Sequence, residues 1–457
     1  MRRELAPTLR LAGPVIVAEL GWMFMGVVDT LMVGRIAPEA IGAVGLGSIL
    51  YFSTAIFGMG VLLGLDTFVS QAYGAGQIRE CHRWLRDGVH LAALLTPVLM
   101  LVNLGLMALL PAFDLHPDVH RLTAPYLKVV AIGSLPLLLY AAFRRYLQAV
   151  GLVMPIMVTL VAANVVNAVA NWILIFGKFG LPALGVTGAA WATNVSRTFM
   201  AATLLVVILR HEHRIRAGLF DVPFLTVEWR RLGQLLRLGV PAAMQLTAEV
   251  GVFGAVAALA GRISPVALAA HQVALNLASV TFMAPLGLSS AGAVRVGHAI
   301  GRRSVDEASS AGWSAMALAT TFMGLSAVVF VVGAGPLVRL FTDDPAVVAT
   351  GIALLRVAAA FQLFDGLQVV ATGALRGLGD TRTPMLSNLI GHWVLALPIA
   401  AYCGFSLGFG VIGLWAGLSL GLTIVALTLL ATWRRHIRAL RSNPAALSRL
   451  VPGGMHS

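Results

Sequence analysis

The chain has little charge for its length. Only 11% of its 457 residues are Asp, Glu, Lys or Arg, whereas a typical soluble domain carries about 25%. Hydrophobic residues make up 58% of the chain, and the mean hydropathy is +0.88. The apolar runs are continuous rather than alternating, which excludes a membrane β-barrel. The sequence therefore predicts an all-α polytopic membrane protein.

The chain also has few cysteines and lacks several common catalytic motifs. The two cysteines, Cys81 and Cys403, lie far apart, which argues against a disulfide framework or a cysteine-ligated metal site. No P-loop, HExxH or CxxC pattern occurs. The triplet His211-Glu212-His213 is better explained as part of a solvated linker than as a metal site. We expect a protein that is not an enzyme and has no cofactor.

Acidic residues and lysine are few, and the basic residues are unevenly placed. The chain has 32 basic and 19 acidic residues, a net charge of +13, and only two lysines. The arginines gather in alternate connections between apolar runs, which indicates the positive-inside rule and not a nucleic-acid partner. This pattern places both termini in the cytoplasm of a bacterial-type inner membrane and requires an even number of spans.

Twelve apolar runs are long enough to cross a bilayer. They are expected at 12–34, 44–72, 88–110, 123–146, 154–177, 186–209, 235–260, 270–298, 311–334, 348–374, 385–404 and 411–433. The expected organisation is an N-lobe (1–210), a cytoplasmic linker (211–233), a C-lobe (234–434) and a cytoplasmic tail (435–457). Each lobe is a six-helix bundle.

The two lobes are related by an internal repeat. One constant shift along the chain aligns Gly34-Arg35-Ile36 with Gly261-Arg262-Ile263, and Gly60 with Gly287. The same register continues without gaps to Glu80 and Glu307. Since each half has six spans and starts on the same side, the repeats are parallel, as in many secondary transporters.

Three acids lie deep inside predicted spans: Asp29, Glu249 and Asp365. A carboxylate at that depth costs at least ~2.5–3.5 kcal/mol, so such residues usually face a partner or a wet cavity. A carboxyl in such a place can exchange a proton, or two carboxylates can strip water from a small cation. Glu19 and Asp66 lie nearer the cytoplasmic ends, where a structural role is favoured.

Polar neighbours suggest one site in each lobe. Any single Asn in such a helix is most often a contact between helices, but these coincide with the acids. The candidate coupling groups are Asp29, Asn167, Asn171 and Thr193 in the N-lobe and Glu249, Asp365, Gln272 and Asn276 in the C-lobe. The candidate lining of a pocket for flat organic cations is Gln245, Phe253, Phe282, Met283 and Phe361.

Six stretches together resemble the MATE family of multidrug and toxic compound extrusion transporters, closest to its NorM-type branch. They are VVDTLMVGRI (27–36), FVSQAYGAG (68–76), NAVANWILIFG (167–177), LGVPAAMQLTAEVGVF (238–253), AHQVALN (270–276) and FQLFDGLQVVATGALRGLGDTRTP (361–384). The resemblance implies two bundles that alternate access and export cationic or amphipathic drugs by antiport with H+ or Na+.

The resemblance also assigns positions. Asp29, Asn167 and Asn171 match the family's N-lobe ion or proton site, and Glu249 and Asp365 match its C-lobe site, so Na+ is a candidate ligand at either. Some relatives carry an aspartate at the position of Asn171, and some sodium-coupled ones a tyrosine at that of Phe361. Asn171 weakens the binding of any cation there by one charge, and Phe361 favours H+, while both ions stay open from the sequence.

Other classes remain as alternatives. A lipid-linked glycan flippase of the same broad superfamily would need a basic cavity, and a membrane scaffold would not need three deep acids. A channel would show a ring of selectivity groups. We expect a monomer whose partners are small organic cations and the lipid bilayer.

Overall fold

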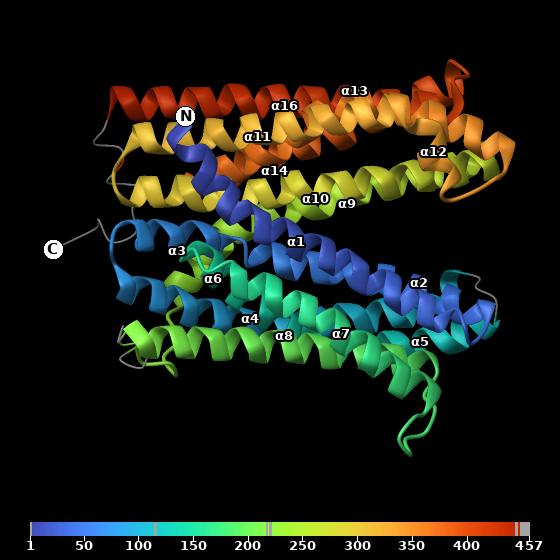
Figure 1. Ribbon diagram of the computed structural model, residues 1–457, viewed down its shortest axis with the longest axis horizontal. Helices are drawn as coiled ribbons and strands as arrows, with labels where there is room; N and C mark the ends of the chain where they lie inside the picture. The colour runs from blue at the N-terminus through green and yellow to red at the C-terminus, as the bar shows by residue number, and fades with distance from the viewer. Residues whose placement is uncertain (1, 114–116, 216–217, 219–221, 444–446, 448–457) are drawn as a thin grey trace. The chain divides into compact units, whose positions relative to one another are not determined.

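The computed structural model describes the whole chain except residues 1, 114–116, 216–217, 219–221, 444–446 and 448–457. The described part is helical and contains no strand (Figure 1). The elements of the first half are α1 (Arg2–Val33), α2 (Pro38–Val61), α3 (Gly64–Gly74), α4 (Ile78–Leu109), η1 (Leu110–Phe113), α5 (Pro117–Ile132), α6 (Ser134–Ala149), α7 (Met154–Phe176) and α8 (Val186–Ile215). Those of the second half are α9 (Trp229–Ile263), α10 (Pro265–Gly301), α11 (Val305–Val332), α12 (Ala334–Arg339), α13 (Pro345–Gly377), α14 (Arg382–Asn388), η3 (Leu389–Ala396), α15 (Leu397–Ala401), η4 (Tyr402–Ser406) and α16 (Gly410–Ser442).

The membrane-spanning pattern matches the twelve expected runs. Among the described residues, 11 helical stretches are long and apolar enough to cross a membrane, and 12 if α5 and α6 form one span. The expected span 44–72 is α2 followed by α3, with a short break between them, and the expected span 385–404 contains π-helical turns. The prediction of an all-α polytopic membrane protein is confirmed.

The span made of α5 and α6 bends by 45° at Gly133. The amide of Gly133 bonds to the Val130 carbonyl, one residue short of an α-helical bond, which frees the Val129 carbonyl. Asn194 on α8 donates to that carbonyl at 2.6 Å, and Arg197 donates to the Val130 carbonyl at 3.2 Å. In a membrane a helix break is tolerated only where neighbours bond the freed groups. These two side chains make the bend possible.

The chain forms two compact units, 17–243 and 1–16 with 244–457. One boundary falls inside α1, before Val17, and the other inside α9, before Met244. These two positions are equivalent in the sequence repeat. The lobes predicted from chain order, 1–210 and 234–434, remain a prediction.

Each unit contains an equivalent close helix crossing. In unit 17–243, a Cβ atom added to Gly60 on α2 would lie 2.6 Å from the Cα of Ala243 on α9. In the other unit, a Cβ added to Gly287 on α10 would lie 2.5 Å from Cγ1 of Ile16 on α1. The shift that aligns Gly60 with Gly287 also aligns Ile16 with Ala243, so the repeat extends from sequence to packing.

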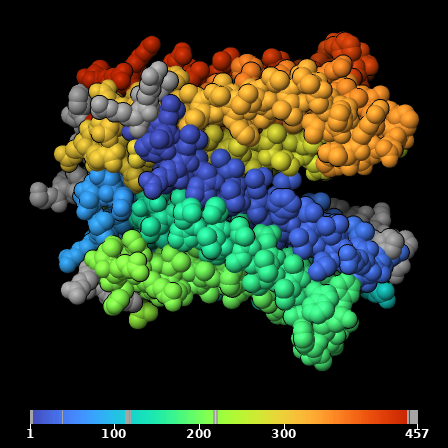
Figure 2. All heavy atoms as spheres, viewed as in Figure 1, coloured from blue at the N-terminus to red at the C-terminus, as the bar shows by residue number. Residues whose placement is uncertain are grey.

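Within unit 17–243, α7 and α8 pack along each other, and Figure 2 shows their side chains meeting on this face. This pairing sets the polar side chains of α7 beside those of α8. The turn after α7 begins at Gly177, whose φ of 67° is in the left-handed region that glycine adopts without strain.

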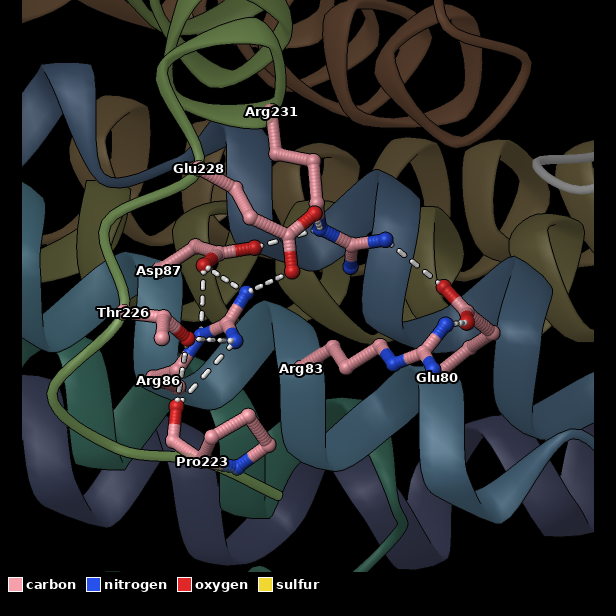
Figure 3. A network of polar contacts seen from close by, with 8 residues as sticks. All are labelled: Glu80, Arg83, Arg86, Asp87, Pro223, Thr226, Glu228 and Arg231. Carbon is pink, nitrogen blue, oxygen red and sulfur yellow. Dashed lines mark hydrogen bonds and ion pairs between the residues drawn. The ribbon is translucent and has the colours of Figure 1, made fainter.

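The connection between the halves is fixed to α4 by a buried guanidinium (Figure 3). Arg86 is 1% exposed and donates to Asp87 at 2.8 Å and to Glu228 at 2.6 Å. It also donates to the Pro223 carbonyl and to the Thr226 hydroxyl, each at 3.3 Å. The hydrogen bond from Arg86 holds the pKa of Glu228 below its usual range.

Arg231 adds a second attachment of this connection to α4 (Figure 3). It donates to Asp87 and, at 2.8 Å, to Glu80, and its guanidinium lies 3.8 Å from the centre of the Trp84 ring. The start of α9 is therefore held by ion pairs and a cation–π contact within unit 17–243.

Arg86 and Arg83 form a matched pair for testing this attachment. Arg86→Gln should lower stability by about 3–5 kcal/mol, because it leaves buried Asp87 without one of its two cations. Arg83→Gln should change stability little, because Arg83 is 49% exposed and pairs with Glu80 alone. Thermal unfolding of the purified proteins in detergent measures both. Equal midpoints for the two variants would contradict a buried attachment.

Candidate functional site

The four N-lobe candidates meet around one carboxylate. Asn171 donates to Asp29 Oδ1 at 2.6 Å, and Thr193 donates to Asp29 Oδ2 at 3.1 Å. Asn171 also donates to Asn167 Oδ1 at 3.1 Å. Asp29 and Thr193 are each 8% exposed, and both asparagines are fully buried. The site is built from α1, α7 and α8. The spacing of Asn167 and Asn171 predicts that they share one face of α7, and both face the cluster.

Unused polar atoms remain in this cluster. The amide nitrogen of Asn167 and the amide oxygen of Asn171 are buried and have no hydrogen-bond partner among the described residues. Together with the carboxylate of Asp29, the oxygens form a donor set that suits a proton or a small hard cation. The cluster can therefore bind one proton or one small cation at the Asp29 carboxylate.

Arg197 is a charged neighbour that the sequence analysis did not assign to the site. It lies one helical turn after Thr193 on α8 and is 7% exposed, and its charge acts on Asp29. The i, i+4 spacing of Thr193 and Arg197 was the available signal. A fixed guanidinium beside the cluster weakens its attraction for a second cation.

The C-lobe acids lie on α9 and α13. Glu249 and Asp365 are each 9% exposed. Glu249 accepts a hydrogen bond from Gln368 Nε2 at 3.0 Å, and Gln245 lies one turn earlier on α9. Gln368 was missed from sequence, although its position three residues after Asp365 places it on the same face of α13.

Two predicted C-lobe residues are not in this cluster. Gln272 is exposed and Asn276 is half-buried, and neither donates to Glu249 or Asp365 among the bonds of the described residues. Their place in a coupling site remains a prediction.

The predicted pocket residues differ in how deeply they are buried. Gln245 and Phe361 are 4% exposed, whereas Phe253, Phe282 and Met283 are half-buried. Phe361 packs on Trp415 with ring centres 5.6 Å apart, and Trp415 donates to His271 Nδ1 at 3.0 Å. Phe361 therefore belongs to an aromatic cluster inside its unit.

Two further acids in predicted spans, Glu19 and Asp66, have arginine partners. Arg144 donates to Glu19, and Arg145 lies 3.5 Å from Asp66. Glu212 was expected in a solvated linker, but it lies in α8, is 4% exposed and bonds to His82 and Tyr146. No group of three metal-ligating side chains occurs in the described ranges.

A model of the MatE family matches residues 14–173 and 241–402. The chain belongs to the MatE family. The two matches begin at Pro14 and Pro241, which the sequence repeat aligns, so the repeat seen in the sequence and in the helix crossings is one MatE unit per half. Members are membrane transporters, so this MatE chain is a multi-pass transporter and not an enzyme, as predicted.

Relatives match the MatE chain over almost its whole length. It is 37% identical over 444 residues to a probable multidrug resistance protein NorM of Mesorhizobium japonicum, covering 96% of this chain and 95% of that protein. It is 38% identical over 442 residues to a probable multidrug resistance protein NorM of Pseudomonas putida, covering 94% and 95%. The expected likeness to the NorM-type branch is confirmed.

Solved structures show the same fold. The eukaryotic MATE transporter AtDTX14 has a TM-score of 0.85 at 21% identity, covering 97% of this chain and 99% of that one. A MATE transporter in the bent conformation has a TM-score of 0.83 at 19% identity, covering 96% of both chains. These matches confirm the fold of two pseudo-symmetric helical bundles.

The Asp29 cluster predicts a pH-dependent effect of Asn171. Asn171→Leu removes a donor whose bond to an ionised carboxylate is stronger than its bond to a neutral one, by roughly 1 kcal/mol. The loss of thermal stability relative to wild type should therefore grow as the pH rises. Unfolding midpoints measured in detergent from pH 5 to pH 9 test this.

Asn164→Leu is the matched control. Asn164 lies on the same helix and bonds to the carbonyls of Gly21 and Leu160, not to an acid. Its loss of stability should be the same at every pH. A pH-independent loss in Asn171→Leu would show that Asn171 does not hold the ionised form of Asp29.

Proposed function

We propose that this MatE protein is a secondary multidrug exporter of a bacterial-type cytoplasmic membrane, with both termini in the cytoplasm. It exchanges cationic or amphipathic organic compounds for protons by alternating access, and works as a monomer. The names of its relatives as multidrug resistance proteins support the substrate class.

One observation carries the proposal: each compact unit buries at least one carboxylate that makes no ion pair among the described residues. Asp29 is held by an amide and a hydroxyl, and Glu249 by an amide. No ion pair to Asp29, Glu249 or Asp365 occurs among the described residues, whereas Glu19 has one. A buried carboxylate without a fixed counter-ion can accept a proton or an organic cation in turn.

The proton is favoured over Na+ by two features. Asn171 supplies no second negative charge to the Asp29 cluster. In the C-lobe, Phe361 has no hydroxyl and packs on Trp415. Sodium needs several oxygen ligands and a net negative site, while protonation needs only one carboxylate.

The transport cycle follows from competition for these carboxylates. In the inward-facing state an organic cation binds near the ionised acids, with Gln245, Phe253, Phe282, Met283 and Phe361 as its predicted aromatic and polar lining. In the outward-facing state a proton neutralises an acid and removes the charge that held the cation. The drug then leaves, and the proton is released to the cytoplasm after the return.

A gradient experiment tests the coupling. Proteoliposomes containing the full chain should drive efflux of ethidium under an imposed pH gradient and not under an imposed Na+ gradient. Glu249→Gln and Asp365→Asn should each lower that efflux at least about tenfold, because neither side chain can then exchange a proton.

Two results would overturn this proposal. Efflux driven by Na+ at equal internal and external pH would assign the coupling ion to sodium. Full pH-driven efflux in both variants would remove the C-lobe acids from the mechanism. Glu80→Gln, which alters an acid in the α4 network, serves as the control and should retain efflux.

A further inference from the structure

Gln368 is a buried amide aimed at a C-lobe acid. It is fully buried on α13, and its Nε2 donates to Glu249 Oε1 on α9 at 3.0 Å. Its own Oε1 is buried and has no hydrogen-bond partner among the described residues. An amide left half-used in a dry site carries an energetic cost, and here the free oxygen belongs to an amide that already contacts a carboxylate.

The free oxygen fits the protonated form of Glu249. A carboxylate only accepts hydrogen bonds, whereas a carboxylic acid also donates one. An amide can donate its N–H to the carboxylate and, after rotating by half a turn, accept the O–H of the acid at its oxygen. A cationic side chain at this position would bond only the ionised form of Glu249, and an apolar side chain would bond neither form.

The backbone around Gln368 is held rigidly. Ser289 on α10 donates to the Val369 carbonyl at 2.7 Å, and a Cβ added to Gly373 would lie 2.3 Å from the Ser289 carbonyl oxygen. Because α10 and α13 are in such close contact, the backbone of Gln368 is held in place and only its side chain can rotate.

Three other titratable groups lie on the helices of this region. Asp365 lies three residues before Gln368 on the same face of α13. His392 on η3 bonds to the Asn388 carbonyl at 3.1 Å, and His271 on α10 accepts from Trp415 at 3.0 Å. Among the bonds of the described residues, neither imidazole reaches Glu249.

We propose that Gln368 is a positioning residue that holds Glu249 in both its ionised and its protonated form. It thereby sets the pH at which the C-lobe acid exchanges its proton. This inference rests on the proposed proton-coupled export.

Gln368 has a matched control on its own helix. Gln362 is 1% exposed and donates to the Thr281 hydroxyl at 3.0 Å rather than to an acid. The variants Gln368→Met and Gln362→Met therefore remove the same group, at similar burial, with and without contact to a carboxylate.

The experiment measures ethidium efflux from proteoliposomes of the full chain over a series of pH values. Gln368→Met should raise the pH of half-maximal efflux by about one unit, since losing one donor to an ionised group favours protonation by that order. Gln362→Met should leave that pH unchanged. Gln368→Glu, which has nearly the same shape, should raise it further, because a third carboxyl repels the ionised Glu249.

The outcomes separate this inference from the proposed function. If wild type shows no pH-driven efflux, the proposed function fails. If wild type is active but both Gln368 variants keep its pH midpoint, or Gln362→Met shifts as much as Gln368→Met, the positioning role fails. If Gln368→Met does not fold, the shift in Gln368→Glu alone decides between these results.

Discussion

Burying a carboxylate within a helical membrane protein is the constraint on which the rest of this structure depends. The cost is at least ~2.5–3.5 kcal/mol per acid, and each hydrogen bond to an ionised group returns about 1.5–3 kcal/mol. Two donors to Asp29 and one to Glu249 are therefore of the size needed to keep these groups ionisable. A full ion pair, as between Glu19 and Arg144, would instead fix the charge permanently. The neutral donors leave each acid balanced between two states.

The same requirement explains the irregular helix between α5 and α6. The bend frees the Val129 carbonyl, which must be bonded internally. Asn194 on α8 bonds it, and Arg197 donates to the neighbouring Val130 carbonyl. Thr193, directly before Asn194 on α8, donates to Asp29. A single helix thus stabilises the break and completes the acid cluster, so the irregular backbone and the site depend on each other.

The sequence was sufficient for much of this organisation because the relevant signals are local. Asp29, Asn167, Asn171 and Thr193 were predicted from single polar residues in apolar runs, and the structure brings all four together. Gln368 and Arg197 were missed because their importance comes from what faces them across helices, not from spacing alone. Gln272 and Asn276 were included as polar residues in a predicted span of the same half as two of the acids, but rotation of α10 decides which of its side chains reach α9 and α13. Helix rotation is set by tertiary packing, which no local pattern contains.

The repeat shapes the scaffold of the two units but not their chemistry. The repeat partner of Glu249 is Trp22, which stacks on Tyr140 with ring centres 6.1 Å apart, and the partner of Asp29 is Val256, which is fully buried. Along equivalent helices the acids therefore sit seven residues, or about 10 Å, apart. The close glycine crossings were kept in both halves because backbone contact tolerates no added atom. The acids can occupy different positions in the two halves because any interior-facing position can hold a carboxyl group, provided that neighbouring helices supply hydrogen-bond donors. Two copies of one bundle thus carry their candidate proton sites at different levels of equivalent helices.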